Sequence, residues 1–98
     1  MITKQTAVNQ IEITKNGTVQ VRIGLEIVDN GNITHQKWHR TSLPPGYDVD
    51  LQFAMVNANL AQMNELPVSQ ADIDRVRTQC VAAWTPAVVQ SYQASLAV

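Results

Sequence analysis

Charged side chains are absent from two long stretches in the second half of this sequence. No Asp, Glu, Lys or Arg occurs from Thr78 to Val98, and a second uncharged stretch runs from Leu51 to Asn64. A free-standing domain normally spreads charge over its whole exterior, because charged side chains are seldom buried without a partner. Two such stretches are hard to bury completely in 98 residues. We therefore expect the chain to be an oligomer or part of a larger assembly.

Three further absences exclude classes of site. Because Cys80 is the only cysteine, an internal disulfide and a cysteine-based zinc site within one chain are impossible, and folding in a reducing cytosol is the simplest interpretation. The four glycines are scattered and form no phosphate-binding loop. No apolar run is long enough to span a membrane, and the N-terminus has no apolar core of a secretion signal. We expect no cofactor, no membrane and no secretion through a signal peptide.

The composition fits one folded domain, residues 1–98. Charged residues make up 15% of the chain, against a usual share of about 25%. Residues 1–47 contain five Lys or Arg and three acids, whereas residues 48–98 contain two Arg and five acids. Neither balance is strong enough to attract nucleic acid or a membrane by itself.

The first half alternates between apolar and polar residues, which is the period of a half-buried strand. The pattern runs from Val19 to Ile27, and Ile11 and Ile13 give a preceding strand the same signature. A three-residue loop with Gly17 in the left-handed region closes Ile13 on Val19. This loop keeps both apolar rows on one face of the sheet.

A second Asn-Gly turn returns the chain into a third strand, about residues 32–41, for which two registers are open. With a three-residue loop, the core-facing residues are His35, Lys37 and His39. An even-length loop instead pairs Val28 with Ile33 and puts Trp38 opposite Ile23, towards the buried side. We favour the even-length loop, because burying the large Trp38 ring gains more free energy than burying histidines.

Helices follow the proline-rich turn at residues 44–46, which ends the sheet. Asp48 is the expected N-cap of the first helix, Ser69 of the second and Thr85 of a third. The first helix has two apolar faces, so we expect it to be covered on two sides. One face consists of Phe53, Val56, Leu60 and Met63, and the other of Leu51, Ala54, Met55, Ala58 and Ala61.

The order of elements predicts an α+β fold. A three-stranded antiparallel β-meander, with strands at about 7–42, is followed by two to three helices, at about 48–98, packed on one face. There is no internal repeat and no low-complexity linker.

The candidate catalytic and metal-binding residues have simpler structural explanations. His35 and His39 would lie about 13 Å apart along a strand, too far to bind one ion. Cys80 falls on the apolar stripe of the second helix, and helix capping accounts for Asp48 and Asp50. We therefore predict no catalytic residue and no metal site, and we expect that the protein is not an enzyme.

Basic and aromatic side chains gather on two neighbouring predicted strands, where they could contact phosphates and stack a base. Acidic residues on the same strands dilute this charge, so we do not expect nucleic acid as the main partner. The possible nucleic-acid face consists of Arg22, Lys37, Trp38 and Arg40.

The uncharged helices are the expected region of contact with other proteins. The terminal helix after Thr85 is the stretch that this domain has least need to bury. The predicted protein-interface residues are Met55, Ala58, Ala61, Trp84, Val88, Val89, Tyr92 and Leu96.

Three segments carry a resemblance to a known group of proteins. They are Trp38-His39-Arg40-Thr41, Pro44-Pro45-Gly46-Tyr47-Asp48-Val49-Asp50, and Ala82-Ala83-Trp84-Thr85-Pro86 with Val88-Val89. Over nearly its whole length the chain resembles small uncharacterised proteins that tailed bacteriophages encode, often among their tail genes. The resemblance involves structural turns and caps, and it brings no catalytic residues.

The resemblance implies a non-enzymatic structural or assembly protein of a bacteriophage, such as a tail-tip, baseplate or tail-fibre-associated subunit. Its partners would be further copies of itself or other virion proteins, in the virion or the host cytoplasm. The alternative is a small phage-encoded regulator or inhibitor that binds a host protein or nucleic acid through the basic strand face.

Overall fold

A computed structural model describes residues 1–96 and has the predicted α+β order, with three strands followed by three helices. The strands form one antiparallel sheet in the order β1-β2-β3. They are β1 (Ile2–Ile13), β2 (Val19–Asp29) and β3 (Asn32–Leu43). The helices are α1 (Val49–Gln62), α2 (Gln70–Ala83) and α3 (Pro86–Leu96).

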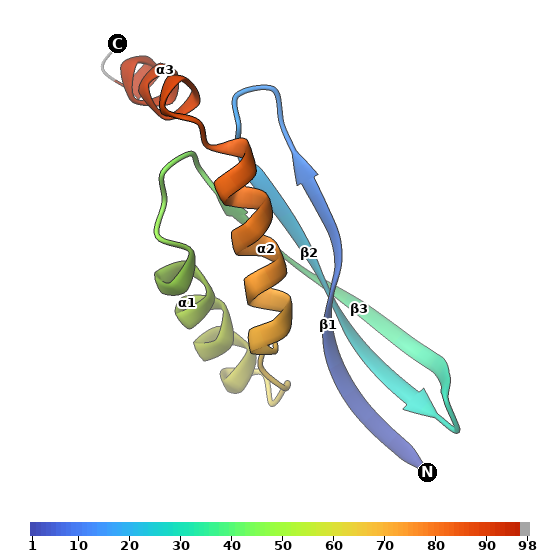
Figure 1. Ribbon diagram of the computed structural model, residues 1–98. Helices are drawn as coiled ribbons and strands as arrows, with labels where there is room; N and C mark the ends of the chain where they lie inside the picture. The colour runs from blue at the N-terminus through green and yellow to red at the C-terminus, as the bar shows by residue number, and fades with distance from the viewer. Residues whose placement is uncertain (97–98) are drawn as a thin grey trace.

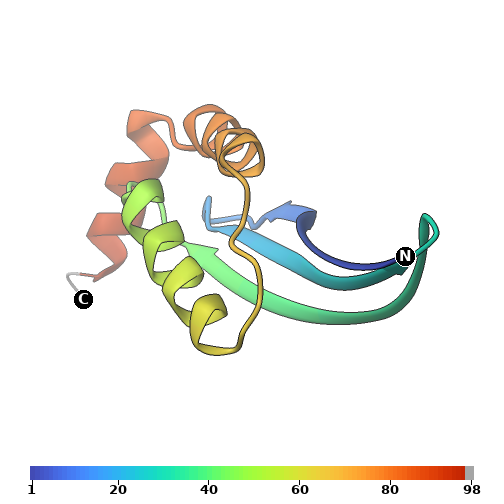
Figure 2. The ribbon, with the colours of Figure 1, turned by 90° about the horizontal axis from the view of Figure 1, so that it is seen from below.

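The helices cover only part of the sheet. α1 and α2 lie side by side over one face of its upper half in Figure 1, and α3 lies near the turn between β1 and β2. The other half, which ends in the turn between β2 and β3, extends beyond the helices, as the view from below shows (Figure 2). The molecule is therefore elongated, with extents of 52 × 23 × 21 Å.

The core forms where one face of the central strand meets one stripe of each long helix. Val19, Val21 and Ile23 of β2 are at most 1% exposed. Burying a side chain of this size gains roughly 1.5–3 kcal/mol. The helical stripes that cover this row consist of Phe53, Val56 and Leu60 from α1 and Ile73, Val76 and Cys80 from α2.

The predicted loop between β1 and β2 is confirmed. Ile13 pairs with Val19, and Gly17 has a φ of 91°. The N–H of Gly17 donates to the carbonyl oxygen of Thr14 at 3.0 Å, and that of Thr14 donates to the carbonyl oxygen of Thr18 at 2.9 Å. Glycine is suited to this position because it has no Cβ to oppose a positive φ.

β1 begins at Ile2, earlier than the predicted start near residue 7, and it contains a bulge. The register shifts at Asn9, between the pair Val8–Ile23 and the residues beyond it. The extra residue lets Val8 and Ile11 face the helices although they are three positions apart. The alternation of apolar and polar residues breaks at Asn9 and therefore does not mark the part of β1 that precedes the bulge.

The predicted place of Trp38 is wrong. The turn has the even length that we favoured, since Val28 pairs with Ile33, but a bulge at Thr34 then reverses which residues face the core. Trp38 lies opposite Gly24 rather than Ile23, on the face away from the helices, and is 40% exposed. The core-facing row consists of His35, Lys37, His39, Thr41 and Leu43.

The reason is the limited reach of the helices. β3 passes under them only near its end, where Leu43 is fully buried. Leu43 and Trp38 differ by an odd number of positions, so alternation puts them on opposite faces. Burying Leu43 in the core therefore places Trp38 outside it.

The three expected helix caps are present. Each cap accepts a hydrogen bond from the backbone N–H three residues further on, at 3.0 Å for Asp48, 3.2 Å for Ser69 and 3.3 Å for Thr85. A cap of this kind contributes about 1 kcal/mol.

We predict that Gly17→Ala loosens the contact of α3 with the sheet. A Cβ at Gly17 would lie 2.5 Å from Cγ1 of Val88. The free energy of unfolding should fall by roughly 1–2 kcal/mol, because alanine disfavours the left-handed backbone. It should fall by about 1–3 kcal/mol more, because the added methyl group overpacks the contact. The free energy of unfolding in urea measures the sum.

Gly31→Ala is the matched control. Gly31 also has a positive φ, 86°, but a Cβ added there would meet nothing within 4 Å, so this variant should show the backbone cost alone. Adding Val88→Ala to Gly17→Ala should recover part of the loss. Equal losses at the two glycines would contradict the contact between α3 and this turn.

Candidate functional site

The face of α1 that points away from the core is apolar and uncovered. We define the α1 outer face as Leu51, Ala54, Met55, Ala58 and Ala61. Leu51 and Met55 are each 52% exposed, and the three alanines are also exposed. We expected α1 to be covered on two sides. Within residues 1–96 the outer face is uncovered, because α2 lies on the flank of α1. Three of the predicted interface residues, Met55, Ala58 and Ala61, are on it.

The other predicted interface residues are used partly within the chain. Nε1 of Trp84 donates to the carbonyl oxygen of Gly17 at 2.7 Å. Val88 also packs on Gly17, and Val89 packs on Gly46. These contacts join the start of α3 to two turns. Further along α3, Tyr92 is half-buried and Leu96 is 66% exposed.

Three of the four residues of the possible nucleic-acid face lie together on the outer face of the sheet, which is the face opposite the helices. Arg22 of β2 and Arg40 of β3 lie directly opposite each other in the strand register. The guanidinium carbon of Arg22 lies 4.2 Å from the ring centroid of Trp38. Oδ1 of Asn9 accepts hydrogen bonds from Nε and Nη2 of Arg22 at 2.9 and 2.6 Å. Lys37 lies opposite the buried Leu25 and so belongs to the other face of the sheet.

A carboxylate that sequence reasoning missed lies on the same outer face. Glu26 is only 8% exposed, and it accepts hydrogen bonds from Nε2 of Gln5 at 2.7 Å and Nε2 of Gln36 at 2.5 Å. These partners come from β1 and β3, directly opposite Glu26 in both pairings. The row Gln5–Glu26–Gln36 can be recognised only when the registers of both strand pairs are known. In the sequence, each of the three is simply a polar residue on a predicted strand.

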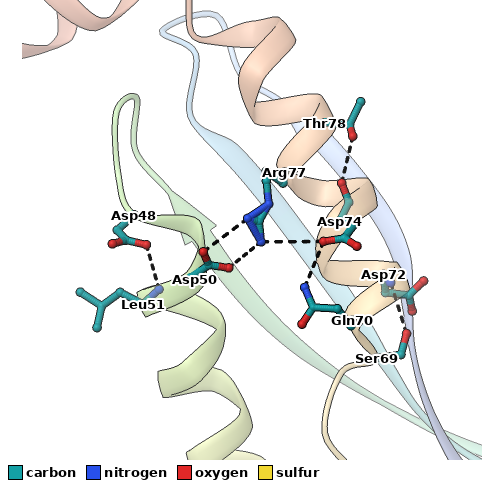
Figure 3. Close-up of polar contacts among 9 residues, drawn as sticks. All are labelled: Asp48, Asp50, Leu51, Ser69, Gln70, Asp72, Asp74, Arg77 and Thr78. Carbon is teal, nitrogen blue, oxygen red and sulfur yellow. Dashed lines mark hydrogen bonds and ion pairs between the residues drawn. The ribbon is translucent and has the colours of Figure 1, made fainter.

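The carboxylates near the helix starts have structural partners. In Figure 3, Asp50 of α1 and Asp74 of α2 both point towards Arg77, which therefore joins the two helices. Nη1 of Arg77 lies 3.4 Å from Asp50, and Nη2 lies 3.8 Å from Asp74. Such exposed pairs contribute at most about 1 kcal/mol. Asp48 caps α1 in the same view, so the pair Asp48 and Asp50 is engaged in structure.

Asp72 has a further contact that the capping pattern did not predict. Its Oδ2 accepts a hydrogen bond from the backbone N–H of Val8 at 2.9 Å. The start of α2 is thereby tied to the outer edge of β1, beside the bulge. Oγ1 of Thr6 donates to the carbonyl oxygen of Leu66 at 2.8 Å and extends the same covered edge.

The histidines and the cysteine do not gather into a site. His35 and His39 lie on one strand, as expected. Cys80 is fully buried between the helices and the sheet. Within residues 1–96, no group of three His, Cys, Asp or Glu side chains is placed to hold a metal ion. None of the helices in this part of the chain has the length and apolar character needed to cross a membrane.

Comparison of the chain with protein-family models, with curated proteins and with solved structures found no match.

We predict that Cys80 is inert towards thiol reagents in the folded protein. Burial raises the pKa of Cys80 from 9.0 to about 11, against the opposing effect of Arg77, and the thiolate is the reactive form. Ellman's reagent near neutral pH should therefore react with Cys80 only as fast as the protein unfolds. Rapid reaction of the native protein would contradict the burial of this side chain.

The same shift in pKa has a consequence for stability. The unfolded chain loses its thiol proton at lower pH than the folded chain, so the folded state should lose stability as the pH rises from 9.0 towards about 11. Below this window the thiol should contribute no pH dependence.

Proposed function

We propose that this chain is a non-enzymatic structural or assembly protein of a bacteriophage, namely a tail-tip, baseplate or tail-fibre-associated subunit that acts through protein–protein contacts. The observation that carries the proposal is the α1 outer face. One side of α1 fills the core, and the opposite side presents Leu51 and Met55 to solvent without a charged residue between them. Contiguous apolar surface of this kind is typical of a site of protein interaction.

The shape of the molecule supports a role in contact. Half of the sheet extends beyond the helices (Figures 1 and 2), so a large part of its surface is available to neighbours. The place within a phage tail rests on the resemblance of the segments around Trp38, Pro45 and Trp84. Partners would be copies of the chain or other virion proteins, and the location would be the virion or the host cytoplasm.

The alternative is a small phage-encoded regulator or inhibitor that binds a host protein or nucleic acid through the basic strand face, and binding of nucleic acid has weaker support. One face of the Trp38 ring is already occupied by Arg22, and Glu26 lies on the same side of the sheet. Lys37 is on the other side, so only two of the three basic residues could act together there.

We predict that Leu51→Lys with Met55→Lys prevents association. Two ammonium groups on the α1 outer face would lose their hydration when a partner covers them, which costs much free energy. In the free chain the same groups stay in water, so the fold should tolerate the substitutions. Sedimentation velocity and native mass spectrometry, on the chain alone and with co-purified tail proteins, should show at least about a tenfold loss of affinity with an unchanged circular dichroism spectrum.

The matched control is Thr78→Lys with Ala82→Lys, which puts the same two charges at the same spacing on the exposed side of α2. This variant should associate like the unmodified chain. A monomer whose mass does not depend on concentration, and which has no affinity for virion proteins, would overturn the proposed function.

A further inference from the structure

The outer edge of β3 carries backbone groups without partners. The N–H of Val8 donates to Asp72 and therefore points away from β2. Ile23 is the partner of Val8 in the register of β1 and β2, so the N–H and C=O groups of Ile23 point away from β1 and towards β3. His39, the partner of Ile23, faces back. Backbone direction alternates along β3, so every second residue points its N–H and C=O groups away from β2, towards the open edge of the sheet. They are Gln36, Trp38, Arg40 and Ser42.

The two edges of the sheet differ in how they are covered. At β1, Asp72 occupies the N–H of Val8, and the side chains of Thr6 and Lys4 bond to the loop that leads into α2. At β3, the one hydrogen bond from a helix within residues 1–96 goes to the side chain of Thr41, which accepts it from Nε2 of Gln52 at 2.6 Å. No residue in 1–96 outside the sheet bonds to the outward backbone groups of β3. A long open edge of this kind is a template for a further strand.

The charge of β3 selects among possible strands. The strand contains Lys37 and Arg40 and no acid. Two copies of β3 side by side would bring these positive charges together, which opposes pairing of the chain with itself at this edge. A strand with carboxylates would be attracted by the same charges.

The outer face next to this edge is prepared for an anion. Arg22 and Arg40 lie directly opposite each other, an arrangement of like charges that is unfavourable by itself. They border an open groove of about 300 Å³, which Gln20, Ser42 and the carboxylate of Glu12 also line. Arg22 is held in place by Asn9 and Trp38, whereas Arg40 makes no side-chain hydrogen bond or ion pair within residues 1–96. The guanidinium of Arg40 is therefore free for a ligand beside the open edge.

We propose that the free edge of β3 accepts an acidic extended segment of a partner protein as a fourth strand. Main-chain hydrogen bonds to Trp38, Arg40 and Ser42 provide the pairing, and carboxylates on the outer face of the added strand reach Arg40 and its neighbour Arg22. This inference deepens the proposed function, on which it rests for the premise of a protein partner. A nucleic acid fits less well, because it has no backbone amide groups that could pair with the open edge.

Binding of a model peptide tests the inference. The probe is a peptide of about ten residues in which Glu and Val alternate, which is at the upper end of the usual range of strand lengths. The comparison is the same peptide with Lys in place of Glu. The acidic peptide should bind at least about ten times more tightly than the basic one. Hydrogen exchange should slow at the amides of Trp38, Arg40 and Ser42 and stay unchanged in β1.

Two variants separate pairing from simple charge attraction. Arg40→Glu should reverse the preference for the acidic peptide, whereas Lys15→Glu, the same change of charge in an exposed turn, should keep it. Ser42→Pro removes one outward N–H without a change of charge and should weaken binding at least about fivefold, since proline on an edge blocks pairing but is tolerated by the fold.

Each other outcome overturns the inference. Binding of the acidic peptide that neither Arg40→Glu nor Ser42→Pro weakens would do so, as would binding of a single-stranded oligothymidine in place of the peptide. Absence of peptide binding by a chain that still associates through the α1 outer face would overturn this inference alone. The variant Leu51→Lys with Met55→Lys should bind the peptide normally, so failure of the proposed function can be recognised separately.

Discussion

Burial of the inner row of β2 is the constraint on which the rest of the structure depends. Val19, Val21 and Ile23 are covered by α1 and α2 from one side, and the helices lie over this one face of the sheet (Figure 2). Both neighbours of β2 adjust to that row. β1 inserts Asn9 so that Val8 and Ile11 face the helices, and β3 inserts Thr34 so that Leu43 does.

The uncovered parts of the sheet satisfy their polar groups by contacts between strands. Glu26 is held by glutamines from both neighbouring strands, and Arg22 is held by Asn9 and Trp38. These contacts order the outer face without a second layer of helices. They also leave Arg40 and the edge of β3 free, which is why we propose that edge as the place for an acidic strand.

The sequence predicted the elements that local rules determine. The alternation of β2, the turn at Gly17 and the caps at Asp48 and Ser69 each depend on residues close together in the chain. The facing of Trp38 and the row around Glu26 could not be predicted in the same way, because a single inserted residue changes the parity of a strand and leaves no mark in the composition.

The candidate contact surface was predicted in part, for a related reason. Hydrophobic spacing shows that α1 has two apolar faces, but it does not show how many of them the chain itself can cover. The structure leaves Met55 and its neighbours exposed, whereas Trp84 and Val88 are engaged with Gly17. Tertiary packing, rather than the absence of charge, therefore distinguishes the surface that is free for a partner.

Oxidative footprinting of the methionines tests the central claim most directly, because Met1, Met55 and Met63 are all exposed in the isolated chain and the thioether oxidises readily when solvent reaches it. The measurement compares the purified chain with the same chain assembled with the partner proteins that we propose for it. We expect Met55 to be protected in the assembly relative to Met63, which lies beyond the α1 outer face. Equal oxidation of Met55 in the free and the assembled chain would contradict the role proposed for that face.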